Sequence, residues 1–151
     1  MKWVMMATAA SISLSFVPNA AFAMTEAECA AAWSAADKNK DGVISLDEGA
    51  RYYAALRVAD KSVSDGKLSQ SEFTTNCRAG VFDARRVDAG APLKGANSFT
   101  EGQAKDRAMA RGFMNAAQLS KDSDGIWRGT AQLDGKTVKI AIDYKGNVVS
   151  Q

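Results

Sequence analysis

The feature that most constrains this chain is a run of twelve residues in which oxygen-bearing side chains and one glycine recur at fixed intervals. Asp37 begins the run, Gly42 stands at its sixth position and Glu48 closes its twelfth. This spacing fits a hard cation such as Ca²⁺, which takes about six to eight oxygen ligands, and the glycine permits the sharp turn. The expected calcium ligands are Asp37, Asn39, Asp41, the backbone carbonyl of Val43, a water held by Ser45, and both oxygens of Glu48.

The run is similar to the calcium loops of the EF-hand family, because six constrained positions agree with that pattern at once. The resemblance implies a helix on each side of the loop, with Ile44 at the eighth position packing inward. Thr25 and Glu28 have the spacing of a capping box, which predicts a helix that continues over Ala27–Ala36. The alternative for the run is a polar surface turn, which Asp, Asn and Gly also form readily.

A second stretch repeats this pattern incompletely. Its end, from Asp65 to Glu72, matches the first loop in register. Counting back from Gly66, however, puts Lys61 at the first position, where its side chain cannot bind calcium. Taking Asp60 as the first ligand adds one residue to the loop, so we interpret the stretch as a degenerate second EF-hand. Its candidate ligands are Asp60, Ser62, Asp65, Lys67 and Glu72, and the sequence leaves open whether they bind calcium.

The two loops are close enough in sequence for one helix, over residues 49–59, to leave the first loop and enter the second. Ile44 and Leu68, the apolar residues at the eighth positions, are expected to form a short antiparallel bridge between the loops. Phe73–Cys77 is expected in the last helix of the pair. Such a compressed pair resembles those of small exported bacterial EF-hand proteins.

The first residues of the chain, 1–23, have the features of a cleaved secretory signal. Lys2 precedes an apolar run from Trp3 to Val17. Ala21 and Ala23 then form the small-x-small pattern cut by signal peptidase. The alternative is a retained membrane anchor, but the run is shorter than the roughly 20 apolar residues that a transmembrane helix needs. We therefore expect a periplasmic or secreted protein without stable membrane insertion after cleavage.

Both cysteines, Cys29 and Cys77, follow the predicted leader and flank the two candidate loops. In an exported protein an even number of cysteines predicts a disulfide. Because this bridge would close a long loop, the chain-entropy estimate assigns it about 4 kcal/mol of stabilisation. The alternative, a redox pair of free thiols, lacks the Cys-x-x-Cys spacing.

The rest of the chain indicates a linker and then a second small unit. Residues 79–97 hold several glycines and scattered charge, which predicts a linker with a helical turn over Val81–Arg86. Thr100 and Gln103 have capping-box spacing and predict a helix that ends at Gly112. Alternating residues and glycine turns predict strands over residues 116–121, 126–133, 136–144 and 148–149.

The strand region contains one clear alternation and one apparent loop motif. The alternation puts one set of apolar side chains on a common face, namely Val138, Ile140, Ile142 and Tyr144. The stretch from Asp122 to Gly125 looks like a third calcium loop, but Ala131 stands at its twelfth position and cannot close a coordination sphere. We predict a hairpin turn there.

One helix on an antiparallel meander is similar to the PepSY-type and beta-lactamase-inhibitor-protein-like domains of exported bacterial proteins. The resemblance covers residues 98–151 and rests on element order and on three short motifs, which begin at Phe99, Gly125 and Asp143. It implies that the unit binds or restrains a protein or envelope partner. It carries over no catalytic residue.

Composition narrows the classes of function. The chain has 19 basic and 17 acidic residues, a near balance that argues against nucleic acid as the main partner. It has no histidine and its cysteines are expected in a disulfide, so we do not expect an enzyme; a hydrolase that uses carboxylates alone is the catalytic alternative.

These observations predict an α+β chain with a helical EF-hand pair over residues 24–78 and a helix on an antiparallel meander over residues 98–151. The expected function is that of an exported calcium-binding protein with a C-terminal protein-interaction domain. The alternative is an envelope inhibitor or chaperone-like module in which calcium is only structural.

Overall fold

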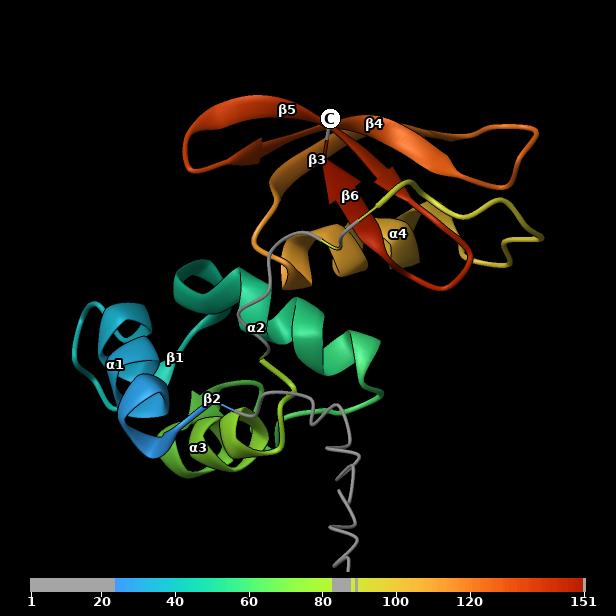
Figure 1. Cartoon of the computed structure of the whole chain (residues 1–151). Coiled ribbons are helices and arrows are strands. Elements are labelled where there is room, and N and C mark those ends of the chain that lie inside the picture. The colour runs from blue at the N-terminus through green and yellow to red at the C-terminus, as the bar shows by residue number, and fades with distance from the viewer. Residues whose placement is uncertain (1–23, 83–87, 89, 151) are drawn as a thin grey trace, which may run out of the picture.

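The computed structural model describes residues 24–82, 88 and 90–150, so the predicted signal peptide, residues 1–23, lies outside the described part. Helices form the N-terminal end and a four-stranded antiparallel sheet forms the C-terminal end (Figure 1), which confirms the expected α+β class. In chain order the elements are α1 (Glu26–Ala36), β1 (Val43–Ile44), α2 (Leu46–Val58), β2 (Leu68–Ser69), α3 (Gln70–Arg78), α4 (Glu101–Ala110), β3 (Met114–Lys121), β4 (Trp127–Leu133), β5 (Lys136–Ile142) and β6 (Val148–Ser150).

The N-terminal helices enclose a small aromatic core. The ring of Phe73, on α3, meets Trp33 of α1 and Tyr52 of α2 edge to face, at centroid distances of 5.5 and 4.9 Å. Such pairs contribute about 0.5–1.5 kcal/mol beyond the area that they bury. Phe82 joins this cluster, 5.0 Å from both Tyr52 and Phe73. The helical core therefore extends into the segment predicted as a linker, while most of the turn predicted over residues 81–86 lies outside the described residues.

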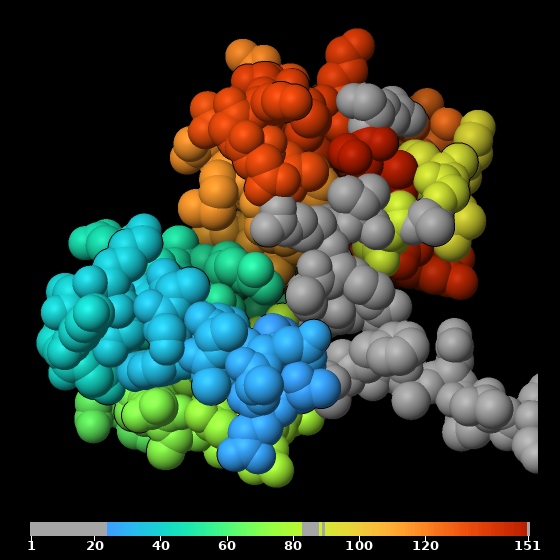
Figure 2. Space-filling view, turned by 60° about the vertical axis from the view of Figure 1, so that its left-hand side comes forward, coloured from blue at the N-terminus to red at the C-terminus, as the bar shows by residue number. Residues whose placement is uncertain are grey.

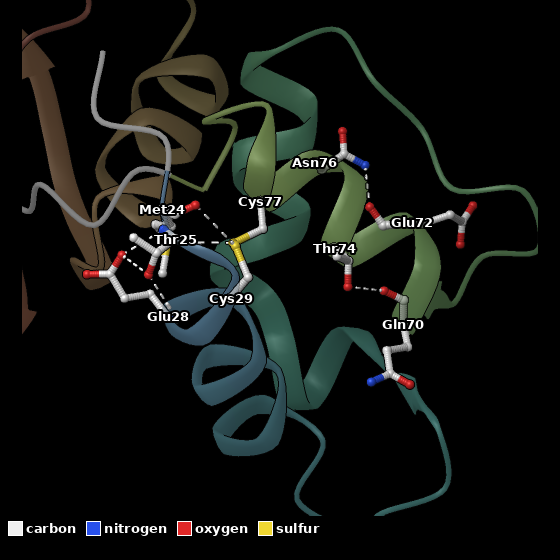
Figure 3. Close-up of a disulfide and its surroundings, with 9 residues drawn as sticks. All are labelled: Met24, Thr25, Glu28, Cys29, Gln70, Glu72, Thr74, Asn76 and Cys77. Atoms are coloured by element: carbon white, nitrogen blue, oxygen red, sulfur yellow. Dashed lines mark hydrogen bonds between the residues drawn. A yellow bond between two sulfur atoms is a disulfide. The ribbon is translucent and has the colours of Figure 1, made fainter. Parts of the chain in front are cut away.

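A disulfide joins Cys29 of α1 to Cys77 of α3, as predicted, with the two Cα atoms 5.9 Å apart. Both cysteines are buried. Figure 3 shows the bridge between the two helices with Met24 beside it, the Met24 Sδ atom lying 3.7 Å from the Cys77 Sγ atom. Because the bridge encloses α2 and both loops, it ties the last helix of the unit to the first.

Each of the four helices in the described part of the chain begins with a capping box. In each one, the side chain of the third helical residue accepts the backbone N–H of the residue that precedes the helix, which satisfies a donor without a helical partner. The capping pairs are Thr25 with Glu28, Ser45 with Glu48, Ser69 with Glu72 and Thr100 with Gln103. The glutamates that close the two loops are thus also the residues that cap α2 and α3.

The C-terminal unit is a meander in the order β3-β4-β5-β6, with α4 packed on one face of the sheet. Register pairs Trp127 with Ile142 and Ala131 with Val138, so these apolar side chains share the face toward α4. Against them pack Ala104 and Ala108, whose small side chains let α4 approach closely, and both are fully buried.

The turns before β4 and β6 are built alike, around Asp122 and Asp143. Each aspartate accepts two backbone N–H groups, from the second and fourth residues after it, at 2.9–3.1 Å. The stretch at Asp122 is therefore a hairpin turn, as predicted. At Asp143 the alternation prediction was wrong: β5 ends at Ile142, Asp143 is fully buried, and Tyr144 is 37% exposed instead of sharing the apolar face. The turn needs the Asp143 carboxylate inside, where it also accepts the Leu93 N–H at 3.1 Å.

Helix α2 is the helix of the N-terminal unit that packs on α4 (Figure 1). At this contact the Arg57 guanidinium binds both carboxylate oxygens of Asp106, at 2.9 and 2.5 Å. The two units lie side by side, with α2 against the unit that contains the four-stranded sheet (Figure 2). Within the described residues, no helix has the length and apolar character needed to cross a membrane.

Candidate metal centre

The first loop begins at Asp37, directly after α1, where the side chain is drawn inward. Asp37 is 7% exposed, and its two carboxylate oxygens accept the backbone N–H groups of Asp41 and Gly42, both at 3.2 Å. The Asn39 Oδ1 atom accepts the Asp41 N–H at 3.0 Å, and the Asp41 Oδ1 atom accepts the Val43 N–H at 3.0 Å. The expected ligand residues therefore curl the chain around their own side-chain oxygens.

Two residues in the left-handed region produce this curl. Lys40 has φ +59° and Gly42 has φ +83°. A Cβ atom at Gly42 would meet nothing within 4 Å, so the glycine is required by its backbone angle and not by lack of space. This confirms the turn that the sequence placed at the sixth position.

Glu48 closes the loop from the first turn of α2. Its Oε2 atom accepts the backbone N–H and the hydroxyl of Ser45, at 3.1 and 2.7 Å, and its Oε1 atom accepts the Asn39 N–H at 3.3 Å. The hydrogen bonds from Ser45 are the main reason that the pKa of Glu48 is lowered, so the side chain is a carboxylate at neutral pH. One hydrogen-bonded loop thus brings together all six expected ligand residues, from Asp37 to Glu48.

Loop 37–48 carries more acidic than basic side chains, namely Asp37, Asp41, Asp47 and Glu48 against Lys38 and Lys40. In the described part of the chain, no lysine or arginine forms an ion pair with Asp37, Asp41 or Glu48. Over the same residues, no three histidine, cysteine, aspartate or glutamate side chains converge on a point that could hold a metal ion. The three carboxylates of the expected set, from Asp37, Asp41 and Glu48, are therefore linked through hydrogen bonds along the loop and do not meet at one point. The donors of the expected set are all oxygens, which fits calcium.

In the second loop the closing glutamate is held by protein groups on both oxygens. The Glu72 Oε1 atom accepts the N–H and the hydroxyl of Ser64, at 3.1 and 3.0 Å. The Oε2 atom accepts the N–H and the hydroxyl of Ser69, at 3.0 and 2.6 Å. The bonds from Ser69, followed by those from Ser64, lower the pKa of Glu72 to about 2. Asp65 and Lys67 line a hollow of about 450 Å³ beside these groups.

The other two candidate ligands of the second loop lie elsewhere. Asp60, with φ +52°, lines a polar hollow between the units together with Asp106 and Arg107. Ser62 lines a different, mainly apolar hollow of about 370 Å³ next to Leu46. The structure therefore does not bring the five candidate ligands of the second loop together, whereas hydrogen bonds link the six expected ligand residues of the first loop.

Tyr53 is a residue at this site that the sequence analysis did not single out. Its hydroxyl donates to the Ile44 carbonyl at 2.7 Å and accepts the Leu68 N–H at 3.0 Å. These are the residues of the predicted bridge, which is confirmed: Ile44 pairs with Leu68 and Val43 with Ser69. A tyrosine on the helix shared by two loops, five residues after Glu48, is the only sequence signal of this contact.

Comparison with known families, curated proteins and solved structures finds no significant match to this chain.

Proposed function

We propose that this chain is an exported calcium-binding protein that holds one Ca²⁺ ion in loop 37–48. The observation that supports this best is one hydrogen-bonded loop that carries three carboxylates, from Asp37, Asp41 and Glu48, none of which forms an ion pair with a lysine or arginine among the described residues. The ion would draw its ligands from Asp37, Asn39, Asp41, Val43, Ser45 and Glu48. When bound, it would neutralise this charge and fasten the end of α1 to the start of α2.

Export is supported by the Cys29–Cys77 disulfide, which forms and persists in oxidising compartments. We place the protein in the periplasm or outside the cell, with residues 1–23 as its leader. The role is one of binding and not catalysis, because the chain has no histidine and both cysteines are bonded.

The C-terminal unit is the proposed interaction domain, and it meets a protein or envelope partner. What supports a link between the two units is α2, which begins in the calcium loop and packs on α4. A second candidate function is that of an envelope inhibitor or chaperone-like module in which calcium is only structural. The capping role of Glu48 favours it, because the loop is already shaped by protein hydrogen bonds.

The test is a calorimetric calcium titration of the oxidised protein that starts at Met24, with thermal melts in calcium and in chelator. We expect one bound ion and a dissociation constant of about 10⁻⁴ to 10⁻³ M, the range that is usual for extracellular sites. We also expect a higher melting temperature in calcium than in chelator. The absence of binding at millimolar calcium would refute the proposal.

A fluorescent dye that binds apolar surface separates the two candidate functions. Increased dye binding in calcium would indicate that the ion exposes a surface for a partner. A rise in stability with unchanged dye binding would favour a purely structural ion.

A further inference from the structure

The second loop is closed by its own side chains. Four donors, from Ser64 and Ser69, occupy both oxygens of Glu72 at distances of 2.6–3.1 Å. In the first loop the equivalent Glu48 has its Ser45 bonds on Oε2, but its Oε1 atom meets the Asn39 N–H at 3.3 Å and no hydroxyl. The Ser64 hydroxyl therefore donates a hydrogen bond to the Glu72 Oε1 atom, which would otherwise be available to a cation.

The place of Asp60 agrees with a closed second loop. Asp60 shares a hollow at the contact between the units with Asp106 and Arg107. Burial lowers the pKa of Arg107, and the negative charges of Asp106 and, less strongly, Asp60 act against this. The only acidic residue that could supply a first ligand to this loop is thus directed to the contact between the units. Asp60 and Ser62 thus lie apart from Asp65, Lys67 and Glu72, which line one hollow.

Tyr53 joins this closed loop to the first one. Its hydroxyl lies between the Ile44 carbonyl and the Leu68 N–H, at 2.7 and 3.0 Å, and also lies 3.3 Å from the Gly66 carbonyl. It therefore contacts the glycine turn of the second loop and both members of the bridge. Ile44 stands between Val43 and Ser45, which are two of the proposed ligand residues, so the phenol fixes the backbone that presents them.

We propose that the second loop is a metal-independent brace, which acts through Tyr53 to hold the closing half of the first loop in its binding shape. This inference rests on the proposed function of loop 37–48. Tyr53 and Ser64 are positioning residues and not ligands. Calcium then binds to a loop that is already ordered. Binding is tighter in that case, because less conformational entropy is lost when the ion binds.

Two substitutions test the brace, each with a matched control. Tyr53→Phe removes the phenol oxygen that connects the loops, and Tyr52→Phe removes the neighbouring hydroxyl, which makes no hydrogen bond within the described residues. Ser64→Ala removes the hydroxyl on Glu72, and Thr74→Ala removes one that only bonds its own helix, at the Gln70 carbonyl. All four variants keep the disulfide.

The measurements are calcium affinity by calorimetry and amide hydrogen exchange in chelator. We expect Tyr53→Phe to weaken calcium binding about tenfold, Ser64→Ala to weaken it less, and both controls to bind like wild type. In chelator, the amides of Ser64, Leu68 and Ser69 should be protected in wild type, and Tyr53→Phe should accelerate exchange at Leu68.

The outcomes separate this inference from the proposed function. Wild-type affinity in Tyr53→Phe, or a second calcium ion bound by wild type, would overturn the brace while leaving the function intact. If wild type binds no calcium, the proposed function fails; protected Ser64 and Ser69 amides in chelator would still support metal-independent closure, and unprotected ones would overturn it.

Discussion

Glu48 and Glu72 hold the same position in their loops, yet their carboxylates serve different partners. Each caps a helix through the serine three residues earlier, Ser45 or Ser69. The difference lies in the second oxygen, which in Glu72 receives two bonds from Ser64 and in Glu48 one longer bond from a backbone N–H. A carboxylate whose lone pairs are occupied by protein donors has less capacity for a cation.

Substitution of Glu48 tests the first loop. We expect Glu48→Gln to weaken calcium binding at least about tenfold, because the closing residue loses its charge and one of its two ligating oxygens. Asp60→Asn should leave calcium binding unchanged, since Asp60 faces Arg107. Calorimetry measures both, and equal losses would show that Asp60 belongs to a calcium site.

The pH dependence of stability tests Glu72. Its pKa is lowered from 4.5 to about 2 in the folded protein, so its bonds stabilise the fold fully above the unfolded pKa and lose their effect as the pH falls toward 2. The stability difference between wild type and Glu72→Gln should therefore shrink between about pH 5 and pH 2. Urea unfolding in chelator at several pH values measures it. A difference that is constant over this range would contradict the assignment.

At the scale of the elements, the hairpin before β4 depends on close backbone contact. Gly125 has φ +76°, and a Cβ atom there would collide with the Gly95 carbonyl oxygen. Gly135, in the next hairpin, has φ +77°, but a Cβ atom there would meet nothing within 4 Å. The two glycines share one backbone strain and differ in the space around them.

Alanine at these two positions separates strain from collision. We expect Gly135→Ala to cost about 1 kcal/mol, the strain of a left-handed residue, and Gly125→Ala about 2–4 kcal/mol, because the 95–97 segment must also move. Urea unfolding gives both free energies. Equal losses of unfolding free energy in the two variants would mean that the 95–97 segment moves aside without a measurable cost.

At the scale of the whole molecule, α2 connects loop 37–48 to the C-terminal unit. It begins with the Ser45 and Glu48 cap and bends at Gly49, where φ is −127° and a Cβ atom would collide with Ile44. It packs on α4. Arg57 near its end binds Asp106 with two hydrogen bonds, which are the main reason that the pKa of Arg57 is raised. One helix therefore runs from the first loop to the contact between the units.

A double-mutant cycle on Arg57→Ala and Asp106→Ala measures this link. The side chains are 48% and 24% exposed, so we expect a coupling energy of about 1 kcal/mol or less, which falls in about 1 M salt. The matched control is the Glu101–Lys105 pair, which lies within α4 and bridges no units. Coupling no larger than in the control would show that the contact between the units rests on apolar packing alone.

Much of the fold could be predicted because its signals are local. The capping boxes at Thr25 and Thr100, the glycine turns and the strand alternation each depend on residues within a few positions of one another, and the elements form where those signals stand. The alternation failed at Asp143, where a turn that needs a buried acceptor overrides the pattern of the strand.

The sequence by itself determined the spacing of the oxygen-bearing residues in loop 37–48, the disulfide pair and the order of the elements, because each follows from residue types and their places along the chain. Only the tertiary structure decided that Tyr53 joins the loops, that Phe82 belongs to the helical core and that Asp60 faces Arg107. These contacts depend on how α2 lies against α3 and α4. Such placement is set by packing between segments far apart in the chain, which no local pattern encodes.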